Sequence, residues 1–179
     1  MSKSLGNVIW AKDLINELGC NVYKWFMLSS HYRNPLNFTD EVLNNVKKEV
    51  EKVENIIKQV SLYLQIQHID HKDYYKNIVD QMVEALSDDL NTSLALSQIL
   101  GQVKVLNQLM RVKEKDDLEI SKNYQTLLCM LDTMGFVYNP KQLSDSEIAL
   151  YQQWQKEKSA KNFEQADLLR QELQNKGIL

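Results

Sequence analysis

A lysine between two serines, with a glycine close behind, stands in the stretch Met1-Ser2-Lys3-Ser4-Leu5-Gly6-Asn7. An ammonium group on a flexible stem, with short hydroxyl donors beside it, suits contacts to phosphate oxygens. Glycine adds the backbone freedom that a moving loop needs. The stretch therefore favours a mobile phosphate-binding loop, and a disordered polar terminus is the alternative that the same composition allows.

Cysteine and histidine residues do not form a metal-binding pattern. Cys20 and Cys129 each lack a second thiol at metal-ligand spacing, so we interpret both as buried packing residues. His68 and His71 are three residues apart, but their polar surroundings predict a loop, which leaves weak zinc binding as an unfavoured alternative. We predict no metal site in this chain.

Two adjacent carboxylates, Asp88 and Asp89, stand before an apolar pattern that begins at Leu94. A carboxylate pair can serve acid–base chemistry or magnesium binding. Acidic side chains also stabilise the N-terminus of a helix through its dipole. We favour this second, structural interpretation.

Basic and aromatic residues gather in two other stretches. The first is a linker around Pro35, in which His31 and Arg33 are candidate RNA contacts, while Tyr32, Leu36 and Phe38 can instead pack on neighbouring helices. The second lies between residues 141 and 179. There, basic groups interleaved with aromatic rings suit unpaired RNA bases, although a plain helical hairpin explains the same pattern; the candidate contacts are Trp154, Lys158, Lys161 and Arg170.

Charge and hydropathy limit the classes of protein that remain. The net charge is −3, from 21 basic and 24 acidic residues, whereas general nucleic-acid-binding surfaces are basic. Residues 61–140 carry the acidic excess, so RNA contacts are expected toward the two ends of the chain. No apolar run approaches the ~18 residues of a membrane span, and no secretory signal is present. We expect a cytoplasmic monomer without a membrane segment.

The elements that must position these residues are helical. Few glycines and prolines, and apolar residues spaced by three and four, predict long helices, the clearest running from Asp40 to Leu64. The expected fold is all-α: a short helical segment, an antiparallel four-helix bundle and a small C-terminal helical hairpin. Expected helix caps are Asn21, Thr39 or Asp40, a capping box at Ser144–Glu147, and a similar device at Asn162 and Gln165.

Four stretches, in order, resemble one enzyme family. Residues 1–7 resemble the second signature loop of class I aminoacyl-tRNA synthetases without its leading lysine. Residues 29–39 and 84–96 resemble segments that follow this loop in cysteinyl-tRNA synthetases. Residues 160–170, running on to Gly177-Ile178, resemble the anticodon-side segment of the same enzymes. The chain is similar to the C-terminal part of a cysteinyl-tRNA synthetase, beginning inside the signature loop.

The resemblance implies a parent enzyme that joins cysteine to its tRNA with ATP. Lys3 would stabilise charge on the triphosphate, with Ser2 and Ser4 positioning the loop. The implied parts are a signature loop and stem-contact segment at 1–39, a DALR-type helical bundle at 40–138 and an anticodon-binding segment at 141–179. Zinc, the nucleotide-binding fold and the first signature would belong to the missing N-terminal catalytic domain, so we expect this chain alone to be inactive.

This chain departs from the family pattern at several positions. Ser93 stands where proline is usual, Trp154 and Lys158 where arginines are common, and Glu157 where a small residue is usual. Two other functions remain open at this stage. One is a related ligase that joins cysteine to an amino-sugar, which would not need the 160–170 segment. The other is a non-catalytic interaction module that docks a partner helix on an exposed apolar stripe of residues 42–64.

Overall fold

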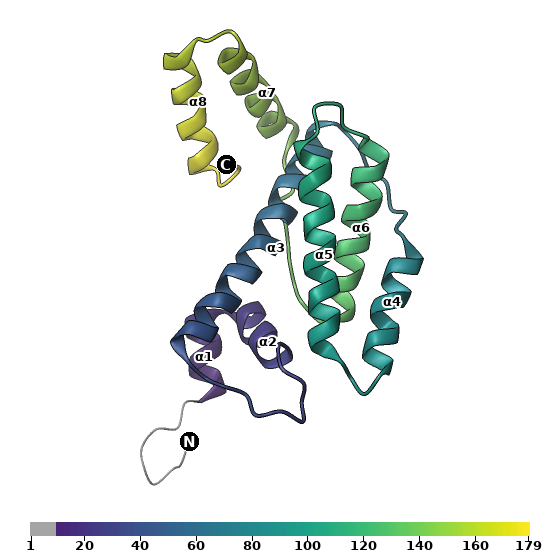
Figure 1. Ribbon diagram of the computed structural model, residues 1–179. Helices are drawn as coiled ribbons and strands as arrows, with labels where there is room; N and C mark the ends of the chain where they lie inside the picture. Colours follow the sequence, from purple (N-terminus) through teal and green to yellow (C-terminus); the bar gives the residue numbers. More distant parts are fainter. Residues whose placement is uncertain (1–9) are drawn as a thin grey trace.

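The protein is built from helices. The computed structural model describes residues 10–179, which hold eight α-helices and no strand, so the prediction of an all-α fold is confirmed (Figure 1). None of the helices in this range combines the length and the apolar character needed to cross a membrane. In chain order the helices are α1 (Ala11–Leu18), α2 (Cys20–Leu28), α3 (Asp40–Ile66), α4 (Lys76–Ser87), α5 (Thr92–Arg111), α6 (Asp117–Thr133), α7 (Asp145–Ser159) and α8 (Phe163–Asn175).

Helices α3 to α6 form the predicted bundle, with successive helices running in alternating directions (Figure 1). The apolar stripe of α3 faces the bundle core, because burying it removes apolar surface from water. Val42 is half-buried, and the other members of the stripe are buried: Val46, Val50, Val53, Ile57, Val60 and Leu64. The stripe is therefore not free to dock a partner helix, which removes the main support for an interaction module.

Two of the predicted side-chain caps are present and two are not. The Thr39 side chain accepts from the Val42 N–H at 3.3 Å, and Ser144 with Glu147 makes a complete capping box at the start of α7. The prediction for Asn21 is wrong, because this residue lies inside α2. Asn162 stands at the predicted N-cap position of α8 and its carbonyl accepts from the Ala166 N–H, but its side chain makes no cap because the amide donates back to Glu157 of α7.

The contacts that fix helix α2 on the bundle include one aromatic and one amide side chain. Trp25 is fully buried, lies 5.1 Å from the ring of Phe136 between centroids, and donates its indole N–H to Glu49 at 2.8 Å. The side-chain amide of Asn21 donates to the Val137 carbonyl at 2.8 Å and accepts from the Val137 N–H at 3.2 Å. These contacts join the beginning of the described chain to the segment that follows α6.

Residues 134–144, the return segment, lead from the end of α6 back along the bundle to α7 (Figure 1). Gly135 has a φ of 72°, and the N–H of Phe136 bonds to the Leu131 carbonyl, so glycine ends α6 as predicted. Helices α7 and α8 then form a hairpin that projects beyond one end of the bundle (Figure 1). The return segment thus connects the α2 end of the molecule with the hairpin end.

Candidate RNA-binding surfaces

The predicted phosphate-binding residues Ser2, Lys3 and Ser4 lie outside the described residues. The other candidate residues are described, and they fall on two separate surfaces. One is the linker after α2, and the other is the α7–α8 hairpin.

The linker cluster consists of His31, Tyr32, Arg33 and Asp89. The Asp89 carboxylate accepts from the Tyr32 hydroxyl at 2.7 Å and from the Arg33 guanidinium at 3.1 Å. Arg33 also donates through Nε to the Tyr32 hydroxyl at 2.9 Å, and a His31 ring nitrogen lies 3.0 Å from the Asp89 carbonyl oxygen. A single acidic residue therefore organises all three side chains of the linker.

This arrangement changes the interpretation of the acidic pair. Neither aspartate lies in the first turn of α5: Asp88 ends α4, Asp89 adopts a left-handed φ of 52°, and Asn91 caps α5. The prediction that the pair serves a helix N-terminus is wrong, because Asp89 holds the linker instead. The hydrogen bond to Asp89 also raises the pKa of the Tyr32 hydroxyl above its ordinary value.

Of the three linker side chains that could pack on neighbouring helices, Phe38 does so, whereas Tyr32 and Leu36 stay exposed. Phe38 meets Phe26 edge-on at 5.6 Å between centroids, as a packing residue should. Tyr32 stays 59% exposed and Leu36 37% exposed. Arg33 is exposed as expected, but its charge faces Asp89, so an RNA phosphate would compete with that carboxylate for the guanidinium.

The second surface is one face of α7. Tyr151 and Trp154 lie 5.2 Å apart between ring centroids, and the Lys158 ammonium lies 5.0 Å from the Trp154 centroid. Together with Gln155 and Ser159 these residues line an open hollow of about 460 Å³. Both rings are half-buried, which leaves part of each available to a flat ligand. Tyr151, Trp154 and Lys158 are called the α7 face below.

The tip of the hairpin carries further exposed groups. Lys161 lies in the turn between α7 and α8 with a left-handed φ of 59°, and Arg170 is exposed on α8. Phe163 is 65% exposed next to this turn, although its apolar character favoured a packing role in the sequence. An exposed aromatic ring beside a lysine has the chemistry to stack on an unpaired base. Phe163 is therefore a candidate that the sequence pattern did not identify.

The bundle contributes a third group beside the α7 face. Tyr63 and Lys115, whose ammonium lies 5.7 Å from the Tyr63 ring centroid, share a hollow of about 290 Å³ with Tyr151 and Gln155. Tyr151 and Gln155 line both hollows, so the end of the bundle and the α7 face adjoin each other. Burial, with the neighbouring Asp117 carboxylate, raises the pKa of Tyr63 to about 12.

The cysteines and histidines of the described range are dispersed. No group of three or more potential metal ligands occurs between residues 10 and 179. His71 lies 3.6 Å from the Asp73 carboxylate on the surface. Cys129 is half-buried, but Cys20 is exposed at the first position of α2, so the expectation that both cysteines are buried is wrong for Cys20.

Two family models match parts of this chain. Residues 1–48 match a family model described as the class I (C) tRNA synthetase catalytic domain, and residues 81–138 match one described as the DALR domain. Curated cysteine–tRNA ligases align with the whole chain, at 33% identity in Mesoplasma florum and 35% in Mycoplasma mycoides. The predicted relationship to the cysteine–tRNA ligases is confirmed.

The chain spans about two fifths of the length of these relatives, 41% in both. The cysteine–tRNA ligase of Thermosipho africanus is 33% identical, over 99% of this chain and 39% of its own length. The catalytic-domain match includes His31, Tyr32 and Arg33, and the DALR match includes Asp89. The linker cluster is therefore a contact between two segments that match different family models.

Proposed function

We propose that this chain is the tRNA-binding portion of an enzyme that joins cysteine to its tRNA with ATP. The observation that carries the proposal is the alignment of the whole chain with cysteine–tRNA ligases. The amino-sugar alternative has less support, because these relatives bear the name of the tRNA enzyme and their similarity extends through α7 and α8.

Each of the three segments expected from the sequence has its own role in this proposal. Residues 1–39 carry the signature loop, in which Lys3 stabilises charge on ATP with help from Ser2 and Ser4, and the stem contact formed by His31 and Arg33. Residues 40–138 form a spacer of fixed length. Residues 141–179 present the α7 face, Lys161 and Arg170 to the anticodon.

The chemistry of the α7 face supports this assignment. Aromatic rings accept the π-face of an unpaired base, and a nearby ammonium attracts the phosphate backbone. Trp154 and Lys158 supply both within one helix turn. The overall charge of −3 disfavours indiscriminate binding to duplex RNA, which suits a surface that selects a loop.

The proposal is tested by binding of the chain to cysteine tRNA and to an anticodon-swapped tRNA, across a salt series. A preference for the native anticodon that persists at high salt is the expected result. Equal binding that fades with salt would reduce the interaction to phosphate attraction. The chain alone is expected to form no cysteinyl-tRNA, and its addition of cysteine to RNA would contradict the assignment of catalysis to the missing catalytic domain.

Trp154 gives a residue-level test of the same proposal. Replacing Trp154 by alanine removes a base-stacking platform worth about 1–3 kcal/mol, so the affinity for the native tRNA should fall by roughly 5- to 150-fold. Trp154→Phe keeps an aromatic face and should recover much of the loss. An equal effect of Trp154→Ala on both tRNAs would show that Trp154 does not discriminate between the two anticodons, and no effect on either would show that it does not contact the tRNA.

A further inference from the structure

The α7–α8 hairpin has an apolar core of its own. Ile148, Ala166, Leu169 and Leu173 are buried between the two helices, and none of them belongs to the core of the bundle. Among the helices of residues 10–179, α8 packs on α7 alone, and α7 touches the bundle only at α3. Units joined through small interfaces move relative to each other by default. Apolar packing therefore does little to hold the hairpin against the bundle.

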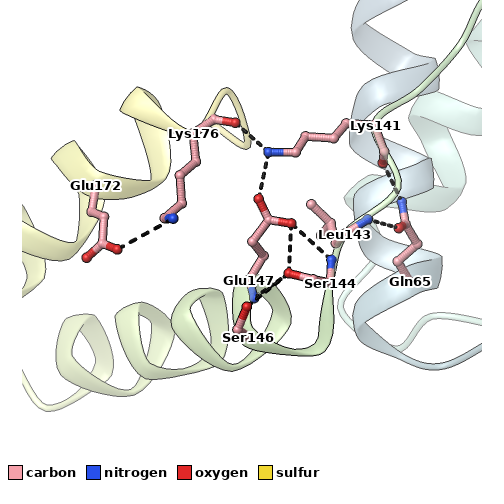
Figure 2. A network of polar contacts seen from close by, with 8 residues as sticks. All are labelled: Gln65, Lys141, Leu143, Ser144, Ser146, Glu147, Glu172 and Lys176. Carbon is pink, nitrogen blue, oxygen red and sulfur yellow. Dashed lines mark hydrogen bonds and ion pairs between the residues drawn. The ribbon is translucent and has the colours of Figure 1, made fainter.

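Polar contacts connect the hairpin to the bundle, and the first is made by Gln65 in the last turn of α3 (Figure 2). The Gln65 side-chain amide donates to the Lys141 carbonyl at 3.1 Å and accepts from the Leu143 N–H at 2.8 Å. It also donates to the Ser61 hydroxyl at 3.0 Å, which fixes its own orientation on the helix. Gln65 thus holds the backbone of the return segment just before α7 begins.

The second contact is made by the Lys141 ammonium, which joins three segments (Figure 2). It donates to the Glu147 carboxylate in the first turn of α7 at 2.7 Å and to the Lys176 carbonyl after α8 at 2.6 Å. The ion pair with Lys141, followed by the Ser144 N–H, lowers the pKa of Glu147 to about 2. One side chain of the return segment therefore holds both the beginning of α7 and the end of α8.

The space around these contacts is not filled by other side chains. A hollow of about 360 Å³ lies between α3, the return segment and the residues after α8, and Gln65, Lys141 and Ile178 are among its lining. An open hollow offers no close packing that would keep the hairpin in place if the polar contacts were lost. The orientation of the hairpin depends on a few directional bonds.

We propose that Lys141 is a positioning residue that, together with Gln65, sets the orientation of the α7–α8 hairpin relative to the bundle. This orientation places Tyr151 beside Tyr63 and brings the α7 face into line with the end of the bundle. A tRNA that contacts both then binds two surfaces whose spacing is already fixed, which lowers the cost of making the second contact. The RNA part of this inference rests on the proposed function, whereas the geometric part does not.

Lys176 provides a matched control for Lys141. Between residues 10 and 179, its ammonium pairs with Glu172 of α8 at 4.0 Å and with no other residue, whereas its backbone carbonyl accepts from the Lys141 ammonium (Figure 2). Lys141→Met and Lys176→Met each remove one positive charge from the same region. Only Lys141→Met also removes the bonds to Glu147 and to the Lys176 carbonyl. Lys141→Arg keeps donors for the carboxylate and the carbonyl and is expected to restore the wild-type behaviour.

The first measurement is the distance between the bundle and the hairpin without RNA. In a Cys129→Ser background, spin labels on the exposed Cys20 and on Gln171→Cys report this distance by pulsed electron paramagnetic resonance. The distribution is expected to broaden in Lys141→Met and to keep the wild-type width in Lys176→Met and Lys141→Arg. A separate Gln65→Leu variant should broaden it as well. A wild-type distribution in Lys141→Met overturns the proposal.

The second measurement separates positioning from direct contact. Lys141→Met is expected to lose affinity for cysteine tRNA relative to Lys176→Met, while both bind a short anticodon-loop oligonucleotide equally. Equal tRNA affinity in the two variants would overturn the role in RNA binding, and an equal loss of affinity for the tRNA and for the oligonucleotide would make Lys141 a contact residue instead. If the wild-type chain binds no tRNA, the proposed function fails, and the distance distributions still decide whether Lys141 fixes the hairpin.

Discussion

The hydrogen bond from Trp25 to Glu49 allows the docking of α2 on the bundle to be tested quantitatively. Trp25 is 0% exposed, so its indole N–H depends on the Glu49 carboxylate at 2.8 Å. Glu49→Ala would leave that buried donor without a partner, at a cost of about 1–3 kcal/mol in the free energy of unfolding. In a chain of this size each kcal/mol lowers Tm by roughly 2–4 °C. Glu49→Gln keeps a carbonyl acceptor and should lose about 1 kcal/mol or less.

Urea unfolding followed by circular dichroism measures these changes, and a double-mutant cycle isolates their cause. Trp25→Phe removes the N–H together with part of the ring, and it destabilises the protein on its own account. In that background Glu49→Ala leaves no buried indole N–H without a partner, so it should change the free energy of unfolding little. If Glu49→Ala costs the same with and without the indole, the hydrogen bond does not secure α2, which is then held by the burial of the ring, its contact with Phe136 and the bonds of Asn21 to Val137.

Three further predictions concern protonation and backbone conformation. Because the pKa of Glu147 is lowered to about 2, its contribution to the free energy of unfolding should be complete above pH 4.5 and should be lost as the pH falls toward 2. In Lys141→Met this loss should occur at higher pH. An acid titration followed by circular dichroism measures the difference. Because the pKa of Tyr63 is raised to about 12, its phenol should ionise near pH 12, as followed by ultraviolet absorbance, and the free energy of unfolding should fall between pH 10 and 12. Ionisation of Tyr63 near pH 10 would contradict the burial of its hydroxyl. Gly101→Ala, inside α5 with open space at its Cβ position, should raise the free energy of unfolding by about 0.5–1 kcal/mol. Gly135→Ala, at a φ of 72°, should lower it by about 1 kcal/mol, and effects of the same sign at both glycines would contradict this reasoning.

The fold could be predicted because its determinants are local. The apolar spacing that begins at Val42 reports directly which face of α3 is buried, and Thr39 and Ser144 cap helices whose first turns follow them in sequence. The same reasoning failed for the position of Asn21 and for the side-chain cap of Asn162. Each is a good capping residue in composition, but each finds a partner outside the first helical turn, Val137 in one case and Glu157 in the other.

The candidate surfaces were less predictable because their geometry depends on distant partners. Arg33 and Asp89 are 56 positions apart, and nothing in either local sequence links them. Lys141 showed no pattern of its own, since its partners are brought to it by the packing of α7 on α8. The α7 face was partly predictable, because Trp154 and Lys158 are one helical turn apart and must lie on the same side.

The bonds between Asn21 and Val137 also have a consequence for synthesis on the ribosome. They join residues 116 positions apart, so α2 emerges long before the segment that completes its binding site. At ordinary translation rates of ~5–20 residues per second, this interval lasts roughly 6–23 s. During that time α3 can supply Glu49 to Trp25, but the side of the ring that Phe136 will cover remains open to solvent or to a chaperone. The N-terminal helices are thus the first part of the described chain to be made and among the last to be secured.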